Sequence, residues 1–192
     1  MLEETPTSPV TATGVQSMWG ATKQICLAVV VMSVLACVGI AIQNSSGLTQ
    51  VKVTAIDPTA EPRDHKIPFF KQKDALPDYE LIVYLNDGGR QKLGTKPNQS
   101  AAEGLQWAVS DPVSVTEISG IGLFDHDKVI SDAITEVQIT DDVVLAGNYK
   151  FEFTTQHSIS VGVRAFFRTP IGKAISAAFF IAFLLLLLAV MA

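Results

Sequence analysis

Three aspartates lie within eight residues of the stretch GLFDHDKVISDAITEVQI, which runs from 122 to 139. They are Asp125, Asp127 and Asp132, and an apolar run that alternates like a β-strand stands on each side of them. Carboxylate oxygens are the ligands that a hard cation such as Ca²⁺ prefers. Aspartate is also common in turns, where its side chain bonds the local backbone. The stretch therefore indicates either a metal-binding loop or a polar turn between two strands.

The rest of the chain offers little for catalysis. His65, His126 and His157 are far apart in the sequence, and no glycine-rich phosphate loop, nucleophile elbow or zinc-ligand spacing is present. No small-molecule substrate site is evident either. The formal net charge of -5 and the lack of a long basic tract argue against nucleic-acid binding. We therefore predict that the protein is not an enzyme.

Two apolar blocks without a charged residue frame the chain, at 25–42 and 174–192. At a rise of 1.5 Å per residue, each block is roughly 27 Å long or more, which is enough to cross a hydrocarbon core. A secretory signal is the alternative for the first block, but its front carries Glu3, Glu4 and only Lys23, which does not fit the basic start of a signal. We predict a two-pass integral membrane protein.

The polar residues between the blocks predict β-structure. The sequence divides into a polar tail at 1–24, a transmembrane helix at 25–43, a polar domain at 47–168 and a second transmembrane helix at 172–192. Apolar alternation predicts eight strands, at 49–56, 79–86, 91–96, 105–109, 117–124, 134–139, 149–155 and 158–166. Asn86-Asp-Gly-Gly89 and Ala146-Gly-Asn148 are hairpin signals. The predicted fold class is all-β, an eight-stranded antiparallel sandwich between two single transmembrane α-helices.

The region from 51 to 166 resembles a C2 domain, an eight-stranded sandwich that often binds calcium and phospholipid through loops at one end. Four segments carry the resemblance: LFDHDKVISDAITEVQI at 123–139, LPDYELIVYL at 76–85, KLGTK at 92–96 and GLQW at 104–107. Thr135 stands where the family has a glycine, Pro77 precedes Asp78 instead of following it, and the asparagine that follows the family's tryptophan is absent. An even strand count between two helices corresponds to the permuted topology of the family.

The C2 resemblance implies a set of calcium ligands. These would be Asp78 in the first loop and Asp125, Asp127 and Asp132 in the third, with Asp64 or Asp74 as an earlier ligand of the first loop. Calcium is thus a possible cofactor. Many C2-like domains bind no metal, and the first loop also carries basic residues that would neutralise the carboxylates as well as a cation would: Arg63, His65, Lys66, Lys71 and Lys73. Both interpretations stay open.

The first loop also carries a candidate contact surface for a partner or a lipid. Because each strand reverses direction, the first and third loops should share the end of the sandwich away from the membrane, roughly 20 Å or more from it. In KIPFFKQK, at 66–73, two aromatic residues stand among three lysines: Lys66, Phe69, Phe70, Lys71 and Lys73. Such a segment could enter an anionic bilayer. Contact with a protein, or packing over the end of the sandwich, is the interpretation that we favour.

Small residues recur every four positions on both predicted helices. They are Ser33, Cys37 and Ala41 on the first, and Ala174, Ala178 and Ala182 on the second. Small residues at this spacing allow helix backbones to approach closely in lipid, although alanine is also frequent in such segments. Basic residues near the helices bear on which side of the membrane the domain lies. Lys23 precedes the first helix, whereas Arg164, Arg168 and Lys173 lie on the domain side of the second. Because the domain side carries more of them, the sequence slightly favours a cytoplasmic domain.

These observations lead to two functional hypotheses. The first is a non-catalytic structural or accessory subunit, which stabilises a larger membrane protein complex through its helices and its sandwich. Its partners would be other integral membrane subunits and the lipid bilayer. The alternative is a calcium-responsive C2-type module that recruits a partner or an anionic membrane.

Overall fold

A computed structural model of the chain describes residues 13–63, 76–126 and 131–191. The chain forms two compact units. One, the helical unit, comprises residues 1–39 and 166–192, and the other, the β unit, comprises residues 40–165. Each unit is described by itself below.

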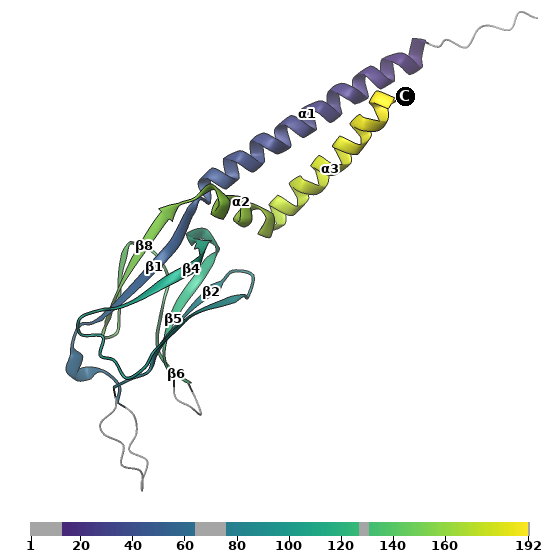
Figure 1. Ribbon diagram of the computed structural model, residues 1–192. Helices are drawn as coiled ribbons and strands as arrows, with labels where there is room; N and C mark the ends of the chain where they lie inside the picture. The colour runs from purple at the N-terminus through teal and green to yellow at the C-terminus, as the bar shows by residue number, and fades with distance from the viewer. Residues whose placement is uncertain (1–12, 64–75, 127–130, 192) are drawn as a thin grey trace, which may run out of the picture. The chain divides into compact units, whose positions relative to one another are not determined.

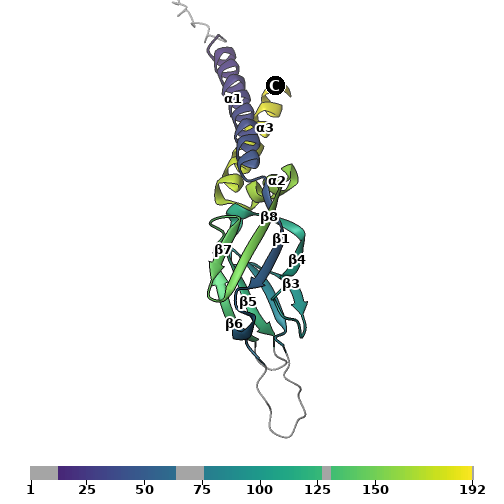
Figure 2. The ribbon, with the colours of Figure 1, turned by 90° about the vertical axis from the view of Figure 1, so that its left-hand side faces the viewer.

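The helical unit consists mainly of α1 (Thr13–Gln43), which belongs to it as far as Gly39, and α3 (Pro170–Met191). The two helices lie side by side in both views (Figures 1 and 2). The segments Gly20–Gln43 and Pro170–Met191 are long and apolar enough to cross a membrane, and an 18-residue window in each has a mean hydropathy of 3.0 and 2.8, respectively. Length and composition thus agree with the predicted two-pass arrangement.

The turn before α3 is closed by local hydrogen bonds. The Thr169 hydroxyl accepts from the Gly172 N–H at 2.9 Å and donates to the Phe166 carbonyl, also at 2.9 Å. Pro170, whose fixed φ suits the first helical position, begins the helix. A Cβ on Gly172 would lie 1.8 Å from the Phe166 carbonyl oxygen, so only glycine fits there. This tight turn fixes where α3 begins.

The β unit is a sandwich of two four-stranded antiparallel sheets (Figure 2). One sheet has the order β4-β1-β8-β7 and the other the order β3-β2-β5-β6. The strands are β1 (Ser46–Ala55), β2 (Tyr79–Leu85), β3 (Arg90–Lys96), β4 (Leu105–Ser114), β5 (Ile118–His126), β6 (Ser131–Val137), β7 (Val143–Ala146) and β8 (Tyr149–His157). Two short 3₁₀ helices follow β1 and β4, η1 (Pro58–Ala60) and η2 (Val115–Glu117).

The core lies between the two sheets and follows the alternation of the sequence. Its buried residues include Leu48, Val51, Val53, Tyr79, Leu81, Val83, Trp107, Val109, Ile121, Leu123, Val137, Tyr149, Phe151 and Phe153. Relative to β8, a register shift between Leu48 and Gln50 inserts one extra residue in β1, so that Leu48 and Val51 both face the core. The Asn86-Asp-Gly-Gly89 and Ala146-Gly-Asn148 hairpins are confirmed, with Gly88 and Gly147 at positive φ.

Two details of the predicted fold are wrong. The predicted strand 158–166 is a helix, α2 (Ile159–Arg168), and the short strand β7 was not predicted. Val161, Val163 and Ala165 alternate as in a strand, but the residues that the fold buries here, Val161 and Ala165 among them, are four apart. The predicted class "all-β" therefore describes the sandwich but not the whole chain, because α1, α2 and α3 are helical.

The chain enters and leaves the sandwich at the same place, which we call the connection end. Ser46 pairs with His157 across β1 and β8, and the Ser158 N–H donates to the Ser45 carbonyl at 2.8 Å. A Cβ on Gly162 would lie 1.9 Å from the carbonyl oxygen of Ala41, so α2 packs directly on the backbone of the last turn of α1. The opposite end, which we call the loop end, carries the connections β1–β2, β3–β4 and β5–β6.

Candidate functional site

A buried carboxylate organises the loop end of the sandwich. Glu61, which follows η1, is 6% exposed and accepts hydrogen bonds from the Tyr79 hydroxyl (3.1 Å), the Ser100 hydroxyl (2.7 Å) and the Ala101 N–H (2.6 Å). Tyr79 also bonds Tyr149 through their hydroxyls at 2.9 Å. We call this set the Glu61 network. It joins the residues after β1 to the starts of β2 and β8 and to the β3–β4 connection.

Both tyrosines of the Glu61 network are held in the neutral form. Burial raises the pKa of the Tyr79 hydroxyl, and the hydrogen bond with Tyr149 and the nearby Glu61 carboxylate raise it further. Burial is also the main reason why the pKa of Tyr149 is raised. A phenol held neutral here serves as a hydrogen-bond donor to a carboxylate. The network is therefore built to hold structure together at neutral pH.

Two of the predicted calcium ligands lie side by side at the loop end. Asp78, just before β2, and Asp125, near the end of β5, belong to neighbouring strands, and a carboxylate oxygen of Asp125 accepts from the Asp78 N–H at 2.9 Å. The Asp78 carboxylate accepts from the Asn98 N–H at 2.7 Å. Asp132 is the cross-strand partner of Asp125 in β6. The structure thus brings Asp78, Asp125 and Asp132 to the same edge, where the first two bond backbone amides.

The other predicted residues of this end lie outside the described residues. These are Asp64, its alternative Asp74, and Asp127 of the calcium set, and Lys66, Phe69, Phe70, Lys71 and Lys73 of the contact surface. Among the residues that the structure does describe, no three His, Cys, Asp or Glu side chains are grouped so as to hold a metal ion. The calcium site and the contact surface stay predictions.

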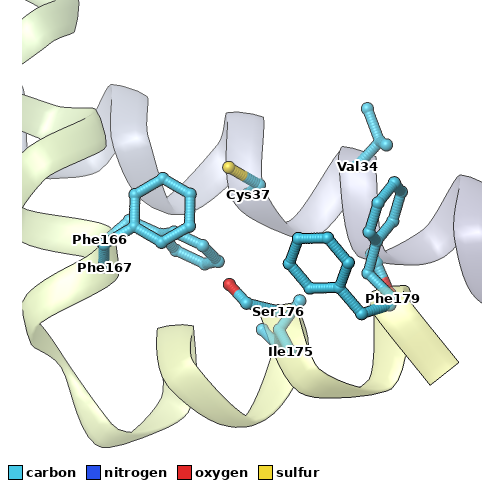
Figure 3. Close-up of a pocket in the computed structure, with 9 residues that line it drawn as sticks. Val34, Cys37, Phe166, Phe167, Ile175, Ser176 and Phe179 are labelled. Atoms are coloured by element: carbon cyan, nitrogen blue, oxygen red, sulfur yellow. The ribbon is translucent and has the colours of Figure 1, made fainter.

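The helical unit contains an apolar groove between its helices, which we call the helix groove (Figure 3). It has a volume of about 260 Å³. The side chains that line it are Ser33, Val34 and Cys37 from α1, Phe166 and Phe167 from α2, and Ile175, Ser176, Phe179 and Phe180 from α3. The Ser176 hydroxyl is used within its own helix, where it donates to the Gly172 carbonyl at 2.8 Å. The wall of the groove is therefore almost entirely apolar.

The small residues predicted to mediate helix packing take different positions. Ser33 and Cys37 line the helix groove, and Ala178 lines a second hollow with Ser33 and Ile175. Ala182 is buried at 5% exposure, whereas Ala174 is exposed. Ala41 lies in the β unit, where its carbonyl meets Gly162. The two stripes thus do not form a single continuous interface.

Sequence reasoning missed the Glu61 network and the aromatic wall of the helix groove. Glu61 stands in a polar stretch between two strands, where a glutamate is normally solvated. The available signal was a pair of tyrosines, Tyr79 and Tyr149, each at the start of a strand and each facing the core, because a buried hydroxyl needs a partner. Of the phenylalanines of the groove, Phe166 ends the predicted strand 158–166, and Phe179 and Phe180 lie within the predicted transmembrane helix 172–192.

Comparison with known proteins adds little. No protein-family model and no curated protein sequence matches the chain. A solved structure of human GIVD cytosolic phospholipase A2, in complex with methyl gamma-linolenyl fluorophosphonate inhibitor and terbium chloride, is similar over 59% of this chain and 18% of that one, with 16% identity and a TM-score of 0.34. The similarity is too low to support a conclusion about the fold or the activity.

Proposed function

We propose that the protein is a non-catalytic structural subunit that stabilises a larger membrane protein complex. The observation that carries the proposal is the outward apolar surface of the helical unit. On α3, Leu184 (58% exposed) and Leu188 (62%) are one turn apart on one face, and on α1, Val31 (47%) and Leu35 (59%) are spaced alike. A surface of this kind must be covered by lipid or by other apolar helices.

The β unit supports a structural role as well. Its most buried polar side chains are used in internal bonds, as in the Glu61 network, and no buried side-chain N or O atom in the described part of the chain lacks a partner. Polar groups that are committed to one another in this way stiffen a domain. A stiff domain that is tied to the helices through both of its chain ends is suited to bracing neighbouring proteins.

The test is extraction of the full-length protein from its native membrane in a mild detergent. We expect it to purify with a fixed set of membrane proteins at constant stoichiometry. The double variant Leu184→Ala/Leu188→Ala should weaken this association if α3 makes the contact, because it removes the outward side chains and keeps the helix apolar. Val31→Ala/Leu35→Ala is the matched variant on α1. Recovery of the wild type only as a free monomer would contradict the proposal.

A C2-type calcium module is the second candidate. It is supported by the hydrogen bonds that join the β1–β2, β3–β4 and β5–β6 connections at the loop end. The Asp78 N–H donates to Asp125, and the Asp78 carboxylate accepts from the Asn98 N–H. Glu61 accepts from Ser100 of the β3–β4 connection. Calcium would need both aspartates as ligands together with residues outside the described ranges. Calcium at 100 times its dissociation constant should stabilise the fold by roughly 2.7 kcal/mol. An unchanged melting temperature of the full-length protein at millimolar calcium would exclude this function.

A further inference from the structure

We propose that the helix groove binds one acyl chain of an anionic phospholipid, whose headgroup lies against the basic segment formed by the end of α2 and the first turn of α3. The basic segment is Arg168-Thr-Pro-Ile-Gly-Lys173. This inference does not depend on the protein being a complex subunit. It requires only that the helical unit lies in a bilayer.

The walls of the helix groove favour a hydrocarbon chain as the occupant. Two ring pairs shape it: Phe166 and Phe167 meet edge to face with centroids 5.1 Å apart, and Phe179 and Phe180 meet in the same way at 5.7 Å. An apolar hollow with so few polar groups cannot hold ordered water, which needs two to four polar partners. A flexible apolar chain fills such a space without leaving a polar group unpaired.

The size of the groove selects one chain over a larger occupant. Its volume of about 260 Å³ lies just below the roughly 300–1,000 Å³ of pockets that enclose a small molecule. A partner helix, about 10–12 Å in diameter, could insert no more than a side chain or two. A single acyl chain with part of its length in the groove fits this volume and the apolar lining.

The charge of the helical unit specifies an anionic headgroup. Within its described residues, 13–39 and 166–191, the charged side chains are Lys23, Arg168 and Lys173, and none is acidic. Arg168 directly follows the groove residue Phe167, and Lys173 stands two residues before the groove residue Ile175. Lys173 is exposed. The exposed Lys173 therefore places a positive charge in the first turn of α3, close to the groove residue Ile175, where lipid headgroups meet the end of a membrane helix.

The experiment compares lipids with the same chains and different headgroups. Full-length protein in detergent is mixed with equal amounts of phosphatidylglycerol and phosphatidylcholine, and the bound lipid is counted by native mass spectrometry. We expect phosphatidylglycerol to be preferred about five-fold, the value that one basic residue near the surface provides. Lys173→Gln should bring the ratio close to one. Lys23→Gln, which removes the same charge elsewhere in the unit, should leave it unchanged.

A second pair of variants tests the groove itself. Cys37→Phe places a ring inside the groove and should reduce binding of both lipids. Val38→Phe adds a ring at the next residue, which is 51% exposed, and should not. Helix content by circular dichroism confirms that both variants fold. Equal binding of the two lipids, equal effects of Lys23→Gln and Lys173→Gln, or unchanged binding in Cys37→Phe would each overturn the proposal.

A photo-crosslinker identifies the occupant in the native membrane. Benzoylphenylalanine in place of Phe179 should attach to a phospholipid. Attachment to a protein instead would mean that a partner fills the groove, and this would also overturn the proposal.

Discussion

A polar network closes the loop end of the sandwich, while direct backbone packing closes the connection end. At the loop end, Glu61 gathers three donors, two of them hydroxyl groups. At the connection end, Gly162 lies against the Ala41 carbonyl with no room for another atom. Hydrogen bonds depend on protonation and on the chemistry of the partner, whereas close packing depends on volume. Charge and pH should therefore perturb one end, and added volume the other.

The largest effect should come from a single methyl group at the connection end. In a helix, Gly→Ala alone stabilises by about 1 kcal/mol. In Gly162→Ala the new Cβ would meet backbone atoms that cannot rotate away, so we expect a loss of about 3 kcal/mol instead. Urea unfolding of the full-length protein, followed by the fluorescence of the buried Trp107, measures this change.

Gly39→Ala is the control for Gly162→Ala. A Cβ at Gly39 would meet no heavy atom within 4 Å, so this variant should show only the favourable helix term. A stabilised Gly162→Ala would mean that the connection end yields to added volume, and the contrast between the ends would be lost.

The next largest effect should come from the loop end. Glu61→Gln keeps the shape of the side chain, but its NH₂ group would face hydroxyl and amide donors, so that hydrogen bonds to a charged acceptor are lost. We expect a loss of about 2 kcal/mol of unfolding free energy in the same urea assay. Glu103→Gln, at an exposed position of the β3–β4 connection, should change stability by less than about 0.5 kcal/mol. Equal effects would show that Glu61 is not a structural acceptor.

Alkaline pH should weaken the loop end selectively. The pKa values of Tyr79 and Tyr149 are raised in the folded state, so above pH of about 10 the unfolded chain loses these protons first. Their contribution is complete below that pH and falls as pH rises, by about 1.4 kcal/mol per pH unit for each tyrosine. Tyr79→Phe should reduce this slope, and so should Tyr149→Phe, because each removes one of the two buried phenols. Identical slopes in all three proteins would contradict the assignment.

The smallest effect should come from an ion pair at the connection end. Arg164 on α2 pairs with Asp111 on β4, and both side chains are largely exposed. Solvent and side-chain entropy reduce the value of such pairs to between about 0 and 1 kcal/mol. A double-mutant cycle with Arg164→Ala and Asp111→Ala measures the coupling free energy. A coupling above that range would mean that charge, and not volume alone, holds this end together.

The strands could be predicted because burial on one face imposes a period of two on the sequence. Seven of the eight predicted strands overlap an observed strand. The exception, 158–166, shows the limit of this signal, because a short run with Val161, Val163 and Ala165 fits a strand and a helix face equally well. What decides is the close approach of Gly162 to Ala41, and these residues are distant in the sequence.

The Glu61 network could not be predicted, for a related reason. Its members come from four separate places in the chain, and no local pattern connects residue 61 with residues 79, 100 and 149. The aspartates, by contrast, cluster in the sequence and drew attention to the loop end. In the structure, Asp78 and Asp125 do meet there, and each bonds a backbone amide. The sequence thus indicated the correct edge of the sandwich but not the residues that hold it.

The pairing of β1 with β8 makes the sandwich a removable insert. Ser46 and His157 are cross-strand partners, so the chain leaves the β unit beside the point where it arrived. Domains with adjacent chain ends are readily inserted into, or exchanged between, host proteins. In evolution, a membrane hairpin could gain, lose or replace such a domain without rethreading its helices. In engineering, a fluorescent domain with neighbouring termini could take the place of residues 46–157 and label the hairpin.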